Sequence, residues 1–156
     1  MRPLLLLAFG FAIIIESCKK GKDETIPTYV SIMNCHNEDN PDSLTMLNRL
    51  KGNWKLVSQN CGWVGVVDVS NKTVKVVLSG DGTYSVTENS TVLSSGTWGL
   101  KRNNNFLGSL NVWQLQLSDA GSYYITGALY NCNKYLAIDG GLAVDGCVFT
   151  YKKTNQ

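Results

Sequence analysis

Short segments in which apolar and polar residues alternate dominate the sequence after residue 50. Eight of them, each rich in Val, Thr, Tyr or Trp, occupy 53–59, 73–79, 83–88, 91–100, 112–118, 123–129, 134–139 and 146–153. In the first, Trp54 and Leu56 flank Lys55, a period of two that places one face of a strand in a core and the other in water. Gly, Asn and Asp stand between the segments, as tight turns require. The pattern predicts an all-β domain.

The short connectors favour one arrangement of these strands. Eight sequential strands joined mainly by hairpins predict an eight-stranded antiparallel up-and-down barrel, in which the first and last strands pair and no open edge remains. A β-sandwich is the alternative. It needs long crossovers, and the long connectors are confined to 60–72 and 101–111. One short helix is expected at 42–50, with Asp42 or Ser43 as its N-cap and Leu44, Leu47 and Leu50 on one face.

The large residues on the apolar faces of these strands are expected to point into the barrel. An eight-stranded barrel has room for one small ligand or for its own side chains. Two hypotheses follow: a small hydrophobic ligand bound inside the barrel, or a filled barrel that acts as a protein-interaction or structural module through rim loops such as 61–68, unless that apolar loop covers the mouth. The expected inward residues are Trp54, Leu56, Val76, Leu78, Tyr84, Val86, Trp98, Trp113, Leu115, Ile125, Ile138, Phe149 and Tyr151.

The chain opens on an apolar run at 4–15, which is too short to cross a bilayer. Arg2 precedes the run and the small residue Ser17 follows it, so residues 1–17 are predicted to be a signal peptide. The stretch Ile15-Glu16-Ser17-Cys18 resembles the lipobox of bacterial lipoproteins, although Glu16 departs from that pattern. The resemblance implies that Cys18 is acylated and becomes the first mature residue. An ordinary cleaved signal peptide is the alternative.

A charged run, Lys19-Lys20-Gly21-Lys22-Asp23-Glu24, follows the cysteine and shows no apolar period. Residues 18–40 are therefore expected to form the lipidated cysteine and a flexible tether, which leaves 41–156 as a single domain. The run is similar to tracts that send lipoproteins to the outer cell face, and it also fits a plain solvated linker. The implied location is the bacterial outer membrane, with the lipid on Cys18 as the membrane partner and the domain on the periplasmic or the cell-surface side.

A second resemblance begins at Leu50-Lys51-Gly52-Asn53-Trp54-Lys55-Leu56-Val57, which resembles the helix end, Gly-x-Trp and opening strand of lipocalins. The stretches 78–84, 95–98 and 149–153 are similar to the small lipocalin-like domains of bacterial envelope lipoproteins, so the likeness covers about 44–153. Lipocalins usually place an arginine of the last strand near the tryptophan. Here only Lys152 and Lys153 are available for a cation over that indole.

Five cysteines are an odd number, but setting Cys18 aside for lipid leaves four, which an exported chain commonly pairs. Four cysteines allow three pairings. In an up-and-down barrel, Cys61 and Cys147 lie at one end of the neighbouring first and last strands. Cys132 lies at the opposite end, where the chain carrying Cys35 enters. The predicted disulfides are therefore Cys35–Cys132 and Cys61–Cys147.

The remaining composition argues against several classes of function. The single histidine, His36, supports no catalytic triad, and Asp81, Asp139 and Asp145 each precede a glycine, as turn residues do. No C-x-x-C or H-x-x-x-H spacing supports a metal site. The net charge is +2 and its basic residues form no stripe, which disfavours nucleic acid. We expect no enzyme activity, no cofactor and no metal.

Overall fold

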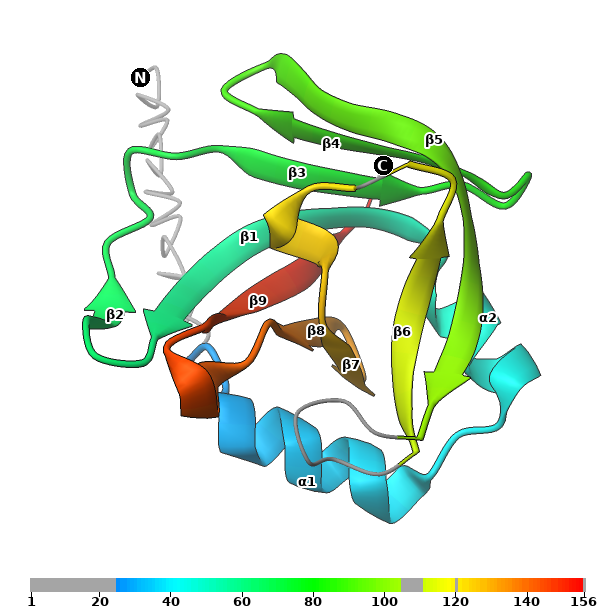
Figure 1. Cartoon of the computed structure of the whole chain (residues 1–156), viewed down its shortest axis with the longest axis horizontal. Coiled ribbons are helices and arrows are strands. Elements are labelled where there is room, and N and C mark those ends of the chain that lie inside the picture. The colour runs from blue at the N-terminus through cyan, green and yellow to red at the C-terminus, as the bar shows by residue number, and fades with distance from the viewer. Residues whose placement is uncertain (1–24, 105–110, 120, 156) are drawn as a thin grey trace, which may run out of the picture.

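The strands form a closed antiparallel barrel in the computed structural model, which describes residues 25–104, 111–119 and 121–155 (Figure 1). Each barrel strand pairs with its neighbour in the chain, and the first pairs with the last from Asn53↔Thr154 to Cys61↔Cys147. The predicted all-β barrel is confirmed. The strands are β1 (Gly52–Cys61), β2 (Gly65–Val67), β3 (Val74–Leu78), β4 (Thr83–Glu88), β5 (Thr91–Asn103), β6 (Val112–Leu117), β7 (Ala128–Cys132), β8 (Tyr135–Asp139) and β9 (Cys147–Thr154).

The ninth strand, β2, is an addition to the eight that the sequence predicts. It pairs with the end of β1 through Gln59↔Val67 to Cys61↔Gly65 and stays outside the ring. Part of the connector at 60–72 is therefore a hairpin, in which β2 folds back along the last three residues of β1 while these also pair with β9. Figure 1 shows this hairpin projecting from one end of the barrel.

All thirteen side chains expected to point inward lie in one core cluster, with exposed fractions between 0 and 9%. Twelve of the thirteen lie on strands, where the period of two identified the inner face; Ile125 reaches the core from a 3₁₀ turn instead. A slip of one residue would have moved each of these side chains to the outer face.

The helix α2 (Ser43–Leu50) closes one end of the barrel. Asp42 caps it, because its Oδ1 accepts a hydrogen bond of 2.7 Å from the backbone N–H of Thr45. The expectation that Leu44 shares the buried face is wrong, since Leu44 is 65% exposed. Met46 and Leu50, four residues apart and therefore on the same side of the helix, are completely buried against the barrel core instead.

The tryptophan of the Gly-x-Trp motif joins α2 to the barrel. Its Nε1–H donates to the carbonyl oxygen of Leu50 at 2.7 Å. The Nζ of Lys153, in the last strand, lies 5.2 Å from the centre of the Trp54 ring and donates to the carbonyl oxygen of Arg49 at 2.8 Å. Burial lowers the pKa of Lys153. Lysine thus occupies the place over the indole that lipocalins usually give to arginine.

A helix occupies 11 residues of the tether expected at 18–40. Residues 29–39 form α1 (Tyr29–Asp39), which packs against β7 and β8. The expectation of a flexible segment is wrong for this part because Ile32 and His36, four residues apart, are buried on the outer faces of those strands. The side chain of Thr28 caps the helix. Cys18, which is predicted to be lipidated, and the rest of the predicted tether up to residue 24 lie outside the described residues, as does the predicted signal peptide.

The strand predicted at 123–129 is also wrong. A 3₁₀ turn, η1 (Tyr123–Ile125), occupies its first half, and β7 starts only at Ala128. Gly127, with φ of 153°, passes so close to β8 that an added Cβ would lie 2.3 Å from the carbonyl oxygen of Asp139. The chain therefore turns inward before β7, and η1 places Tyr124 and Ile125 in the barrel core.

Both predicted disulfides are present, Cys35–Cys132 and Cys61–Cys147, with Cα–Cα distances of 5.8 and 4.0 Å. They lie toward opposite ends of the wall formed by β8 and β9. Cys147 begins β9, whereas Cys132 pairs with Tyr135, which itself pairs with Lys152 near the end of β9. One bridge therefore holds the first strand to the last, and the other holds α1 to β7.

The buried contact between His36 of α1 and Asn131 of β7 leads us to expect that the stability of the fold depends on pH. The backbone N–H of Asn131 donates to Nδ1 of His36 at 3.2 Å, and the carbonyl oxygen of Asn131 lies 3.3 Å from the same atom. Burial lowers the pKa of His36 below its usual 6.5, against the smaller opposing effects of the Asn131 backbone and of Asp39. The unfolded chain then binds a proton before the folded one does. We expect full stability above pH 6.5 and a progressive loss as the pH falls through the interval between 6.5 and the lower folded value.

Thermal unfolding between pH 5 and pH 8 measures this effect, with His36→Gln as the comparison. The exposed carboxylates of Asp42, Asp68 and Asp81 have pKa values lowered by hydrogen bonds to nearby backbone N–H groups, so they stay ionised over this range. The variant is expected to lose most of the pH slope. Equal slopes in both proteins would show that His36 does not cause it.

Candidate functional site

The interior of the barrel is occupied by the protein's own side chains. The largest of its fully buried side chains, Trp54, Tyr124, Phe149 and Tyr151, are exposed by 2% or less. Two hydrogen bonds hold them: the hydroxyl of Tyr151 donates to the carbonyl oxygen of Tyr124 at 2.8 Å, and the hydroxyl of Tyr124 donates to Oε2 of Glu88 at 3.3 Å. Burial raises the pKa of both tyrosines, which keeps the hydroxyls protonated. The residues expected to line a ligand site thus form a packed core.

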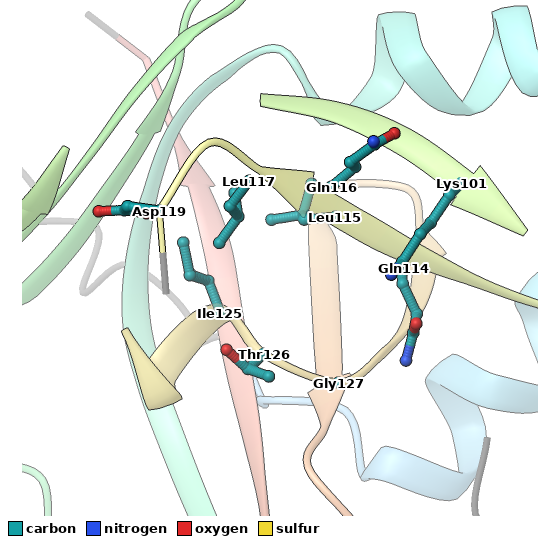
Figure 2. Close-up of a pocket in the computed structure, with 9 residues that line it drawn as sticks. All are labelled: Lys101, Gln114, Leu115, Gln116, Leu117, Asp119, Ile125, Thr126 and Gly127. Carbon is teal, nitrogen blue, oxygen red and sulfur yellow. The ribbon is translucent and has the colours of Figure 1, made fainter. Parts of the chain in front are cut away.

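A cleft lies between β6 and the start of β7, where the barrel has its shortest ladder of paired residues. One residue pair, Trp113↔Leu129, is the whole ladder between β6 and β7, whereas the other neighbouring barrel strands share at least four pairs. The cleft has a volume of about 240 Å³. Figure 2 shows Leu115, Leu117 and Ile125 turned toward one another across it, while Gln116 points away. The lining residues are Lys101, Gln114, Leu115, Gln116, Leu117, Asp119, Ile125, Thr126 and Gly127.

Several polar groups in this cleft already have partners within the protein. Oε1 of Gln114 accepts from Nδ2 of Asn103 at 3.1 Å. Oδ1 of Asp119 accepts from the hydroxyl of Tyr84 and, at 2.9 Å, from the backbone N–H of Gly121. The volume lies below the range of roughly 300–1,000 Å³ typical of small-molecule sites. The cleft therefore has room for a small group only, beside Leu115, Leu117 and Ile125.

The second candidate surface is an apolar rim at the end of the barrel opposite α2. We define it as Ile26, Trp63, Val64, Val66 and Val144, whose exposed fractions are 42, 90, 76, 78 and 62%. Three of the five belong to the β1–β2 hairpin. Val144 comes from the 3₁₀ turn η2 (Leu142–Val144), which lies beside the hairpin. Ile26 precedes α1 and lines a groove with Val66. Side chains of this kind are usually buried, and their grouping makes the rim a candidate interaction surface.

The hairpin of the rim is held firmly at its base. Cys61 is bonded to Cys147 there, and the backbone N–H of Gly62 donates to the carbonyl oxygen of Gly146 at 3.0 Å. Gly65, with φ of 73°, completes the turn. The loop does not fold over the barrel mouth, because Trp63 stays almost fully exposed. It presents its apolar side chains to solvent from a rigid support.

Sequence reasoning found the loop at 61–68 but missed two members of the rim. Val144 lies in a glycine-rich stretch that resembles a plain turn, and Ile26 lies in the segment that was expected to be a tether. Neither carries a local signal of its own. They join the rim only because the β8–β9 connection and the start of α1 fold to the same end of the barrel as the hairpin.

The titratable residues considered for catalysis have structural contacts. Oδ1 of Asp81 accepts from the backbone N–H of Thr83 at 2.9 Å, and Oδ1 of Asp139 accepts from the backbone N–H groups of Gly141 and Leu142 at 2.8 Å each. Asp145 adopts a left-handed conformation at the end of η2. Within residues 25–104, 111–119 and 121–155, no three His, Cys, Asp or Glu side chains gather where they could hold a metal ion.

A comparison with protein-family models, with curated proteins and with solved structures finds no match to this chain. What the structure shows is a closed antiparallel barrel, through the order of its strands and the pairing of the first with the last. In the part of the chain that the structure describes, neither helix is long or apolar enough to span a membrane.

Proposed function

We propose that this protein is a lipid-anchored, non-enzymatic module of the bacterial outer membrane, in which a filled lipocalin-like barrel supports the apolar rim as its working surface. The observation that carries the proposal is the contrast between the two surfaces. The inward residues are packed to exposures of 9% or less, whereas Trp63 is 90% exposed on a hairpin held by a disulfide. The acyl anchor on Cys18 rests on the lipobox resemblance and the cysteine count.

Two further observations support this proposal. Exposing three large apolar side chains on one short hairpin favours aggregation unless a partner covers them. A rigid hairpin also loses little conformational entropy on binding, which preserves the free energy gained by burying its side chains. His36, the single histidine, is taken up by its contact with Asn131, and this favours a role other than catalysis.

Site-specific photocrosslinking tests the rim in living cells. A photoreactive residue in place of Val64 is expected to crosslink to a component of the envelope, whether lipid or protein. The same residue in place of Lys75, an exposed position on β3, is the control and is expected to react far less. Equal and low yields at both positions would contradict the proposal. A mass spectrum of the purified chain, which shows whether Cys18 carries acyl groups, tests the anchor separately.

The cleft between β6 and β7 supports a second candidate, binding of a small hydrophobic ligand by the barrel. Leu115 lines this cleft, and Trp113 belongs to the one residue pair that joins β6 to β7. A ligand with an apolar group of matching size would enter there and quench the fluorescence of Trp113. Titration with fatty acids and other hydrophobic probes tests this, using the Trp63→Phe chain so that the exposed indole does not respond. Unchanged emission over the whole series would leave only the rim proposal.

A further inference from the structure

The place where the chain enters the domain indicates what the apolar rim binds. This inference rests on the proposed function. We infer that the rim docks on the lipid bilayer that holds the acyl anchor, inserting Trp63 and Val64 at the boundary between headgroups and acyl chains. The protein then lies with the hairpin end of the barrel against the membrane.

The first argument is reach. Ile26 lies eight positions after Cys18 in the chain, and a fully extended chain of eight residues spans at most about 29 Å. Ile26, Pro27 and Thr28 line the same groove as Val66, so the chain enters the domain beside the hairpin. The anchor therefore limits how far the rim can lie from the bilayer. The opposite end, closed by α2, is separated from the rim by the ten residues of β1.

The second argument is chemistry. Tryptophan prefers the boundary of a bilayer, where its ring meets acyl chains and its N–H meets headgroups. Trp63 and Val64 stand at the tip of the hairpin, with Val66 three residues beyond Trp63, and no charged residue lies between Cys61 and Val67. A tip of this kind enters the interface without burying a charge. Gly62 and Gly65 flank the two tip residues and add no bulk.

The third argument is charge, which selects the kind of lipid surface. The charged residues nearest to the rim in sequence are three acids: Glu24 before Ile26, Asp68 after Val66 and Asp145 after Val144. Asp68 and Asp145 are exposed, and hydrogen bonds from Ser70 lower the pKa of Asp68, so it stays ionised. An acidic border gives no attraction to anionic headgroups. The contact must therefore be apolar, and docking is expected on zwitterionic lipid with little dependence on salt.

Trp63 is also a built-in probe of this contact. The chain has four tryptophans, and the other three, Trp54, Trp98 and Trp113, are exposed by 1, 8 and 7%. Subtracting the emission of Trp63→Phe from that of the parent protein isolates one indole. The substitution lies on an exposed tip and leaves the core intact.

The experiment uses the full acylated chain in vesicles of phosphatidylethanolamine and phosphatidylcholine, some of them brominated on their acyl chains. Brominated lipid is expected to remove most of the Trp63 emission, and the acrylamide quenching constant is expected to fall by about twofold or more on membrane binding, since the indole leaves water. The matched control combines Trp63→Phe with Leu44→Trp, which moves the exposed indole to α2 at the far end of the barrel. That indole is expected to escape the bromine and to stay open to acrylamide.

Each other outcome overturns the inference in a distinguishable way. Trp63 that stays open to acrylamide on vesicles but is shielded in native envelope membranes points to a protein partner, and then the proposed function stands without the bilayer contact. Shielding that grows with the surface density of the protein points to a second copy of this chain. Docking that needs anionic lipid and low salt contradicts the apolar contact. If Trp63 stays accessible to acrylamide both on vesicles and in native envelope membranes, the inference and the proposed function are both overturned.

Discussion

Replacing Trp54 by alanine is expected to lower the free energy of unfolding by about 3–5 kcal/mol, the usual cost of removing a large aromatic side chain from a packed core. Trp54 is 1% exposed, donates a hydrogen bond to the carbonyl oxygen of Leu50, and lies under Lys153. The substitution leaves a cavity at the barrel end and loosens α2. Denaturant unfolding followed by far-ultraviolet circular dichroism measures the loss.

Trp63→Ala is the matched control, because it removes the same side chain from a position that is 90% exposed. Surface substitutions of this kind usually change stability by no more than about 0.5 kcal/mol. A large loss for Trp63→Ala, or a small one for Trp54→Ala, would contradict the assignment of one indole to the core and the other to the working surface.

Replacing Cys61 and Cys147 together by alanine is expected to lower the free energy of unfolding by about 4–5 kcal/mol, according to the chain-entropy model for a loop of this length. The bridge spans 86 residues and joins the first barrel strand to the last. Without it the unfolded chain gains conformational freedom, while the β1–β9 ladder remains to close the barrel. The measurement is the denaturant midpoint together with the slope of the transition.

The double variant Cys35→Ala with Cys132→Ala separates loop entropy from local effects. Its bridge spans 97 residues, so the same model gives nearly the same loss. This second bridge holds α1 rather than closing the barrel, and its removal is also expected to increase amide exchange in α1. If the Cys61 and Cys147 variant were as stable as the parent, chain entropy would not be the source of the stabilisation.

The barrel could be predicted because most of its strands have one dry face and one wet face. Trp54 and Leu56 alternate with Lys55, and Val74, Val76 and Leu78 are all buried on the inner side of β3. The order of the strands followed from their short connectors. The disulfide pairing then followed from the barrel, since an up-and-down topology decides which cysteines share an end.

The same rule failed where a strand is buried on both faces. In β7 and β8, Leu129 and Ile138 point inward, while Tyr130 and Ala137 pack on the outside against the layer that contains Ile32. Such strands have no wet face, so alternation neither places their ends nor reveals the helix that covers them. The stripe of α1 includes a tyrosine and a histidine, and a period of three to four residues is easily missed among its polar neighbours.

The candidate site could be predicted only in part for a related reason. The loop at 61–68 attracts attention by its composition, since an apolar loop beside a cysteine is uncommon on a surface. The sequence does not predict whether the barrel is filled. Alternation gives the direction in which a side chain points, but not the space that is left between side chains. Tyr124 and Ile125 of η1 fill part of the barrel interior, and they lie in a segment that was expected to be a regular strand.

The two disulfides interlock along the chain, since the span from Cys35 to Cys132 overlaps the span from Cys61 to Cys147. A protease that cuts once anywhere between Cys35 and Cys147 therefore leaves two fragments that at least one covalent link still joins. On a gel, such a nicked molecule keeps its full mass until a reductant is added. A domain exposed to proteolysis can in this way survive a broken backbone as one particle.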